Sequence, residues 1–158
     1  MKRVMLWVLG LVLAAVVGAS VYMRTLSHPA DVWHLDPVEA TRSSTDNDYL
    51  VAPKGVTEAR VDRTFVPREI APKDLLFLFD SIARNSPRVE RLAMDEDNMS
   101  ATYVQTTALF AFPDYITVRA VTVDSRAGLV IWSRSRFGAS DFGVNKERID
   151  DWLAKIGP

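Results

Sequence analysis

The sequence predicts an α+β fold: an antiparallel β-meander covered by two helices and preceded by one N-terminal transmembrane helix. Three observations support this prediction. A charge-free apolar run opens the chain, segments of alternating polarity joined by polar turns fill its second half, and two amphipathic segments with a helical period flank those strands. A chain of 158 residues has room for one domain of ordinary size.

The first element is an uncharged segment, Val4–Met23, in which no charged residue interrupts the apolar run. A helix of this length spans about 30 Å, the thickness of the hydrocarbon core of a bilayer. Lys2 and Arg3 precede it, and an excess of basic residues keeps that end of a span in the cytoplasm. We therefore expect residues 1–24 to form a cytoplasmic start and an anchor in a bacterial inner membrane, with the rest of the chain in the periplasm.

The alternative is a cleaved signal peptide that releases the domain into the periplasm. Val17-Gly18-Ala19 offers the small residues that a signal peptidase needs. However, the apolar run exceeds the roughly 7–15 residues typical of the apolar region of a signal peptide, and Tyr22 and Arg24 are typical of a membrane interface. A retained anchor is the favoured interpretation.

The segment after the anchor is expected to contain a tether at residues 25–30 and a single periplasmic domain at residues 31–158. Residues 31–37, which we call the strap, carry three apolar side chains and should be ordered against the domain. Ala40–Asp48 has no apolar periodicity and is predicted to be a loop. A short strand is expected within Val56–Val66.

The rest of the domain contains two predicted helices and four predicted strands. The helices are Lys73–Asn85 and Lys146–Ile156, which place apolar side chains on one face. The strands are Arg88–Leu92, Ser100–Phe112, Tyr115–Asp124 and Leu129–Arg136. Polar turns between neighbouring strands favour an antiparallel meander, and two helices suffice to cover one face of its sheet.

Composition excludes several classes of protein. The chain has no cysteine, which excludes disulfides, cysteine-based metal sites and a thiol nucleophile. Its 19 basic and 20 acidic residues are balanced, which argues against a nucleic-acid binder. Apart from residues 1–30, the chain has 16 basic and 20 acidic residues, a formal charge of −4. We expect no metal, no cofactor and no catalytic residues.

One segment, Ser133–Arg148, stands out on physical grounds. Arg134 and Arg136 leave the last strand on the same face, two glycines follow, and a helix begins at which Asn145 is a suitable N-cap. Free backbone N–H groups at a helix start near arginines can bind an anion. The candidate ligand-binding residues are Arg134, Arg136, Ser140, Asp141, Asn145 and Arg148.

The competing interpretation of this segment is a rigid structural corner. In that case Arg134 and Arg136 would pair with the carboxylates of Asp114 and Asp141. Gly138 and Gly143 would supply positive φ angles in the loop. Both interpretations stay open on the sequence, and the structural corner is favoured.

The same segment resembles the C-terminal signature of the domain of unknown function 1499 family, an uncharacterised bacterial and plastid family. The resemblance covers roughly residues 50–156 and implies a domain of this family without a defined activity. Many relatives open with a cysteine-bearing segment, whereas this chain has Trp33-His34-Leu35-Asp36-Pro37 there. The residues that match are Ser133–Arg136, Gly138, Ser140-Asp141, Gly143-Val144-Asn145 and Arg148-Ile149, together with Phe112-Pro113-Asp114.

These observations predict a membrane-anchored envelope protein that works as a non-enzymatic interaction module. Its expected partners are the membrane, through residues 4–23, and an unknown envelope protein or small ligand. The alternative is a periplasmic ligand-binding domain for a small anionic or lipid-like molecule. A hydrolase is the third possibility, and it requires a hydroxyl or carboxylate within hydrogen-bond reach of His34.

Overall fold

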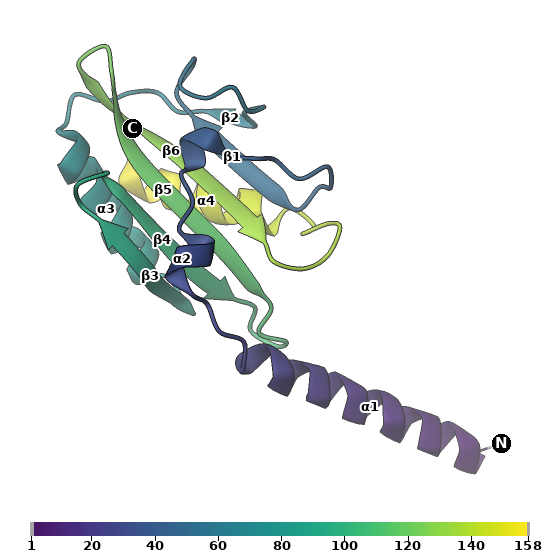
Figure 1. Ribbon diagram of the computed structural model, residues 1–158. Coiled ribbons are helices and arrows are strands. Elements are labelled where there is room, and N and C mark those ends of the chain that lie inside the picture. The colour runs from purple at the N-terminus through teal and green to yellow at the C-terminus, as the bar shows by residue number, and fades with distance from the viewer. Residues whose placement is uncertain (1, 158) are drawn as a thin grey trace.

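The computed structural model describes residues 2–157 and has the predicted α+β architecture, a mixed sheet with helices on one face (Figure 1). The six strands are arranged in the order β2-β1-β6-β5-β4-β3, and only β1 and β2 pair in parallel. The strands are β1 Asp48–Ala52, β2 Arg63–Thr64, β3 Val89–Asp95, β4 Ser100–Thr106, β5 Pro113–Val123 and β6 Arg126–Ser135.

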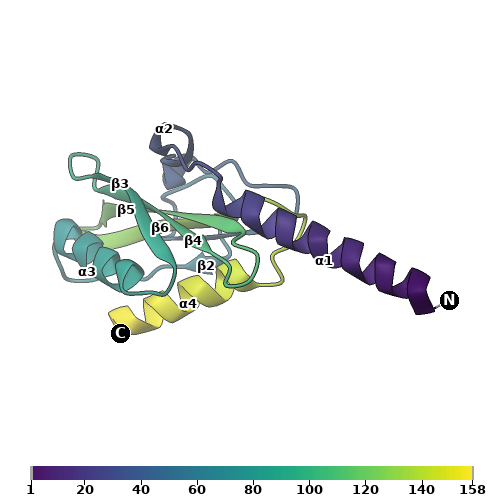
Figure 2. The ribbon, with the colours of Figure 1, turned by 90° about the horizontal axis from the view of Figure 1, so that it is seen from below.

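Two helices, α3 (Pro72–Arg84) and α4 (Val144–Ile156), cover one face of the sheet, as predicted (Figure 2). Their apolar stripes pack on the inward side chains of β4, β5 and β6 and form the larger core. Phe79 of α3 meets Trp152 of α4 edge to face at 5.5 Å between ring centroids. Because this contact joins both helices to each other over the sheet, the helix face is a continuous apolar layer.

The four-strand meander from β3 to β6 confirms the predicted antiparallel arrangement. β5 and β6 pair along their length and are joined by a two-residue turn at Asp124 and Ser125, both with positive φ. The predicted long strand from Ser100 ends early, at Thr106. A turn over residues 107–112 follows, and within it the N–H of Ala111 donates to the carbonyl of Thr107.

The sheet has one strand more than predicted on the β6 side. β1, in which all residues from Tyr49 to Ala52 are buried, pairs antiparallel with β6. A strand covered on both faces shows no alternation of polar and apolar residues, so the sequence pattern does not predict β1. The strand expected within Val56–Val66 is only two residues long in the structure, where it is β2.

The opposite face of the sheet is covered by shorter segments rather than by long helices. α2 (Ala30–Trp33), the 3-10 turn η1 (Pro37–Glu39) and the loops on either side of β1 lie across it (Figure 1). A second, smaller core joins Val38 and Ala40 of these segments to Trp132 of β6. The strap itself is ordered against the domain, as predicted, since Trp33 stacks on Tyr115 of β5 and its carbonyl accepts from Arg134 of β6. Its side of the sheet is called the strap face below.

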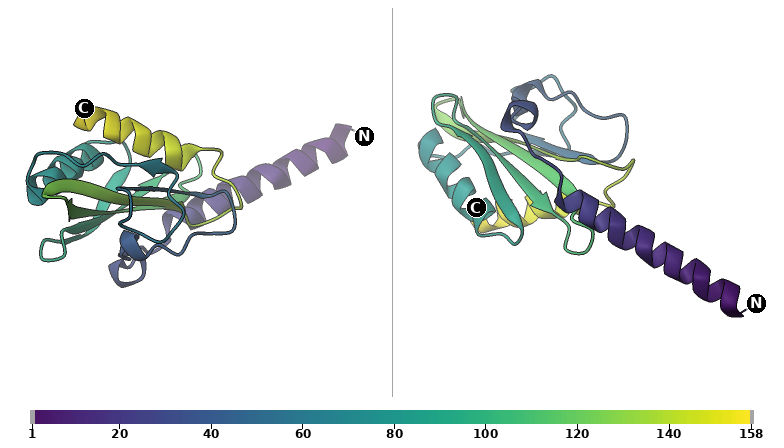
Figure 3. Two further views of the ribbon diagram at one scale, coloured as in Figure 1. Left: turned by 90° about the horizontal axis from the view of Figure 1, so that it is seen from above. Right: turned by 60° about the horizontal axis from the view of Figure 1, so that its bottom comes forward.

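The helix α1 (Lys2–Arg24) extends away from the domain (Figure 3). It is long and apolar enough to cross a membrane, and none of its apolar window is buried against the domain. A helix with these properties is typical of a membrane anchor or of a signal sequence.

Candidate functional site

The six candidate residues lie on both faces of the sheet instead of in one place. Successive side chains in a strand point to opposite faces, so residues two apart share a face. Arg134 of β6 and Arg136, directly after β6, both lie on the strap face. Arg148 approaches from α4 and contacts Ser133 on the helix face. The structure thus separates two arginine clusters, one on each face.

The helix-face cluster is a buried ion pair in which each of the three guanidinium nitrogens has a partner. Arg148, 8% exposed, pairs with Asp114, 5% exposed, at 2.5 Å from Nη2 to Oδ2. Its Nη1 donates to Ser133 Oγ at 2.9 Å and to Asn145 Oδ1 at 2.6 Å, and its Nε donates to Gln105. Because every nitrogen of this buried guanidinium has a partner within the protein, the geometry favours a structural role for this half of the segment.

The loop between β6 and α4 is held by Asp141 rather than by Asn145. Asp141 accepts hydrogen bonds from the N–H of Gly143 at 2.9 Å and of Asn145 at 2.7 Å. The prediction that Asn145 is the N-cap is wrong, because its side chain is turned under the sheet to Ser133 and Arg148. Gly138 and Gly143 do have positive φ, as the structural interpretation predicted.

Ser140, in the middle of this loop, pairs with Asp46 through an isolated parallel β-bridge of the backbone. Its Oγ accepts a hydrogen bond from the N–H of Phe142 at 3.2 Å. Asp114 and Asp141 are thus occupied by Arg148 and by the start of α4. The expected pairing of these carboxylates with Arg134 and Arg136 is wrong.

On the strap face, Arg134 is a buried arginine that binds uncharged groups. It is 7% exposed, and its guanidinium lies 4.1 Å from the centroid of the Trp132 ring. It donates to the carbonyl of Trp33 at 2.7 Å and to Thr117 Oγ1 at 3.3 Å. Burial lowers the pKa of Arg134 to about 10. Its hydrogen bond to the Trp33 carbonyl fixes the strap to the sheet.

Arg136 lies nearer the solvent, at the point where the tether reaches the sheet. Its Nη1 donates to the carbonyl of Ser27 and to Tyr115 Oη, both at 3.2 Å. The Tyr115 ring stacks on Trp33 with 3.6 Å between centroids, and its hydroxyl is 2.8 Å from His28 Nδ1. Burial, and next the charge of Arg136, lower the pKa of His28. The tether and the strap are therefore held by one aromatic and basic cluster.

A second polar cluster surrounds His34. Its Nδ1 lies 2.8 Å from Thr102 Oγ1, and its Nε2 lies 3.3 Å from Ser100 Oγ. Thr102 donates its own proton to Thr117, so the neutral ring that fits carries its proton on Nδ1 and accepts from Ser100 at Nε2. The hydroxyl that a hydrolase requires near His34 is present, and a threonine, not a carboxylate, orients the ring.

This histidine opens to a surface hollow of about 270 Å³. Asp36 and Arg119 form an ion pair at its edge, and Asp95 and Asn98 from the β3–β4 turn line it as well. No spacing of residues along the chain indicates this cluster, because its members come from the strap, β4, β5 and a turn.

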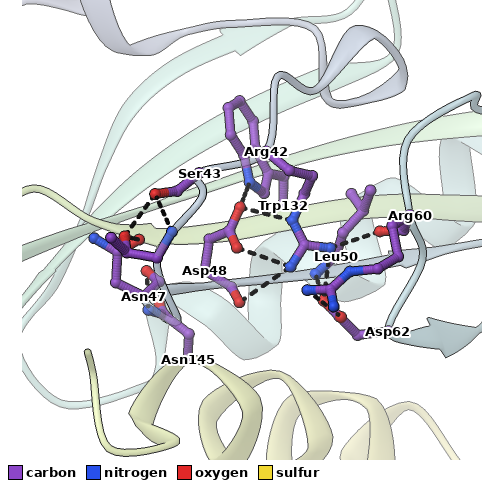
Figure 4. Close-up of polar contacts among 10 residues, drawn as sticks. Arg42, Ser43, Asn47, Asp48, Leu50, Arg60, Asp62, Trp132 and Asn145 are labelled. Carbon is purple, nitrogen blue, oxygen red and sulfur yellow. Dashed lines mark hydrogen bonds and ion pairs between the residues drawn. The ribbon is translucent and has the colours of Figure 1, made fainter. Parts of the chain in front are cut away.

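The sequence also did not predict a network around Arg42 (Figure 4). Arg42 contacts both carboxylate oxygens of Asp48 at 2.8 Å, through Nε and Nη2, and Asp62 at 2.8 Å through Nη1. The indole of Trp132 donates to Asp48 at 3.0 Å. This network ties the loops before and after β1 together and closes the strap face at that end.

The fold and these clusters define a helix-covered α+β domain carried behind an apolar N-terminal helix. The chain belongs to the DUF1499 family, whose model, described as "Protein of unknown function (DUF1499)", matches residues 38–156. The matched range contains the buried Arg148–Asp114 corner, whereas α1 and the strap precede it. The comparisons with curated proteins and with solved structures found no match.

Proposed function

We propose that the protein is a single-pass protein of the bacterial inner membrane, with its N-terminus in the cytoplasm and its domain in the periplasm, where it works as a non-enzymatic interaction module. One observation carries the proposal. α1 leaves its apolar side chains uncovered along the whole helix, while the residues that follow it are bound to the sheet. An uncovered apolar helix is stable in lipid and costly in water.

The end of α1 is fixed to the domain by named contacts. Ser20 Oγ donates to the carbonyl of Leu109 at 3.1 Å, and Arg24 Nη2 donates to the same carbonyl at 3.2 Å. His28 and the carbonyl of Ser27 are bound by Tyr115 and Arg136. A domain held in this way stays close to the bilayer in one orientation, which suits a module that presents a surface to a neighbouring protein.

The membrane arrangement can be tested with single cysteines, because the natural chain has none. Asp97→Cys places a thiol in the exposed β3–β4 turn. We expect a membrane-impermeant maleimide to label it in intact spheroplasts, and the full 17.7-kDa chain to resist carbonate extraction. Labelling only after lysis would overturn the periplasmic orientation. A shortened chain in the carbonate supernatant would overturn the anchor in favour of a signal peptide.

Arg136 is the arginine of the candidate set that best suits a partner, since it is only partly buried, whereas Arg134 is enclosed. We expect a photo-crosslinker at Val32, an exposed residue of the strap next to Trp33, to capture a discrete envelope partner in cells. Because the Arg136 guanidinium lies 5.4 Å from the Trp33 ring centroid, Arg136→Ala should abolish that product. Arg126→Ala, at an exposed position in the distant β5–β6 hairpin, is the matched control. Unchanged crosslinking in Arg136→Ala would exclude this arginine from the interface.

A hydrolase is a second candidate, favoured by the 3.3 Å approach of Ser100 Oγ to the acceptor nitrogen of His34. In such a step Ser100 Oγ would attack the acyl carbon of an ester while His34 Nε2 takes the hydroxyl proton. The ester C–O bond would then break, the proton on His34 would pass to the leaving alcohol, and water would hydrolyse the acyl-enzyme. A fluorophosphonate probe should then label the wild-type chain and spare Ser100→Ala, with Ser44→Ala labelled like the wild type. Absence of labelling in the wild type would remove this candidate.

A further inference from the structure

We infer that the domain makes a second membrane contact through the β4–β5 turn (residues 107–112) and the β6–α4 loop (residues 136–143), which lie in the interfacial layer of the bilayer that α1 spans. The inference rests on the proposed anchoring and adds to it the face of the domain that meets the lipid. It also identifies the partner of that face as the bilayer surface.

The two loops expose an unusual set of large apolar side chains. Phe142 is 94% exposed and Leu109 is 70% exposed. Phe112 and Phe137 are about 40% exposed and join the two loops, with ring centroids 6.4 Å apart. Phe110 extends the same cluster from Phe112 at 5.8 Å. Single exposed apolar residues are ordinary in water, but a cluster of them marks an interaction surface.

The cluster lies at the end of the domain from which α1 extends. The carbonyl of Leu109 accepts from Arg24, the last residue of α1, and from Ser20, one turn before it. Arg24 marks the level at which the helix leaves the hydrocarbon, so Leu109 lies at the bilayer surface. The β6–α4 loop reaches toward the same side as α1 in both panels of Figure 3. Aromatic rings are most stable at this depth of a membrane.

Basic side chains accompany the apolar ones at this level. Arg24, His28 and Arg88 line a hollow of about 300 Å³ between the end of α1 and the β4–β5 turn. Asp141, the acidic residue of the β6–α4 loop, is turned inward to cap α4. A domain with a formal charge of −4 therefore presents Arg88, beside Arg24 of α1, where lipid phosphates lie.

Packing within the domain does not explain why a phenylalanine stands at position 142. Its backbone is left-handed, with φ of 54°, a conformation that bulky side chains rarely adopt. Its side chain is almost wholly exposed, so no packing within the domain offsets this strain. Insertion of the ring among lipid headgroups supplies that packing. Because the patch continues the surface at which α1 enters the bilayer, a soluble protein would compete with lipid for it.

The test places an environment-sensitive fluorophore on single cysteines of the full chain in nanodiscs of phosphatidylethanolamine and phosphatidylglycerol. The positions are Phe142→Cys and Leu109→Cys in the loops, Leu13→Cys within α1, and Asp97→Cys at the far end of the sheet. We expect lipids with a spin label near the headgroup to quench positions 142 and 109, lipids labelled deep in the acyl chain to quench position 13, and neither to quench position 97.

The outcomes separate the two proposals. Quenching at position 13 with none at 142 and 109 would overturn the second contact and leave the anchor intact. No quenching at position 13 would overturn the anchor itself. A blue-shifted probe at 142 that lipid quenchers do not reach would mean that a second copy covers the patch, which also overturns the inference.

A second variant tests the contribution of the apolar side chain. Phe142→Ser should reduce the shallow quenching at Leu109→Cys, because the loops insert together. Phe77→Ser, at a 38% exposed phenylalanine on α3, is the matched control and should leave that quenching unchanged. Equal quenching in the two variants would contradict a role for Phe142.

Discussion

The two arginine clusters on opposite faces of the sheet offset the free-energy cost of burying a charge in different ways. Arg148 has a carboxylate partner, Asp114, in an almost solvent-free corner. Arg134 instead has two aromatic neighbours, Trp132 and Trp33, and a backbone carbonyl. A guanidinium can be buried against rings in this way because it is weakly hydrated and planar.

Removal of Arg148 should be strongly destabilising. Arg148→Met leaves the carboxylate of Asp114 buried without its partner, which typically costs about 3–5 kcal/mol. Urea unfolding of the full chain in detergent, monitored by tryptophan fluorescence, measures this loss. Arg126→Met, in an exposed ion pair, should change stability by less than about 0.5 kcal/mol. A similar loss in both variants would show that the corner contributes no more than a surface charge.

His28 should titrate below the ordinary histidine pKa of 6.5, first because it is partly buried and next because Arg136 is close. As the pH falls below that value, the unfolded chain binds this proton before the folded chain does, so the stability of the folded state falls. Arg136→Gln should raise the midpoint toward 6.5, measured by the shift of the ring proton signals in NMR spectra. Arg126→Gln should leave it unchanged, and an unchanged midpoint in Arg136→Gln would contradict the assigned cause.

At the scale of elements, the sequence predicted those strands and helices that have one buried face, because such elements show alternating polarity or an apolar stripe. The meander and both covering helices were predictable for that reason. β1 was not, because Tyr49–Ala52 is buried on both faces and shows no alternation. The start of α4 also differs from the prediction: the N-cap residue is Gly143, and Asp141 rather than Asn145 accepts the free backbone N–H groups there. This outcome depends on which side chain packs under the sheet, a tertiary property.

The β5–β6 hairpin offers a way to stabilise the domain. Its turn places Asp124 at φ 48° and Ser125 at φ 65°, a left-handed pair that favours glycine at the second position. Ser125→Gly should therefore raise the free energy of unfolding by about 1 kcal/mol. Ser44→Gly, in the exposed loop before β1, controls for a general effect of glycine and should bring no gain. A lower melting temperature for Ser125→Gly than for the wild type would contradict the turn geometry.

At the scale of the whole molecule, the sheet separates two layers of different chemistry. The helix face is the larger apolar core, closed by the Arg148 corner, whereas the strap face combines a smaller apolar core with polar and aromatic contacts. Sequence reasoning placed Arg134 and Arg136 on one face, because residues two apart in a strand share a face. It could not place Arg148 on the other, because the face on which α4 packs is a tertiary property.

The strap should therefore open more readily than the sheet beneath it. Trp33→Ala removes the stack on Tyr115 but leaves the backbone carbonyl that accepts from Arg134. Loss of about 1.4 kcal/mol of local stability should speed hydrogen exchange about tenfold in residues 31–37, while β5 and β6 keep their protection.

Hydrogen–deuterium exchange with mass spectrometry of the full chain in nanodiscs measures both regions at once. Phe77→Ala, on the outer side of α3, is the matched loss of an aromatic ring and should leave the strap unchanged. If β5 and β6 exchange faster in Trp33→Ala by the same factor as the strap, the two layers unfold as one unit. In that case the strap is part of the cooperative core, and its polar contacts contribute to global stability as much as the apolar helix face does.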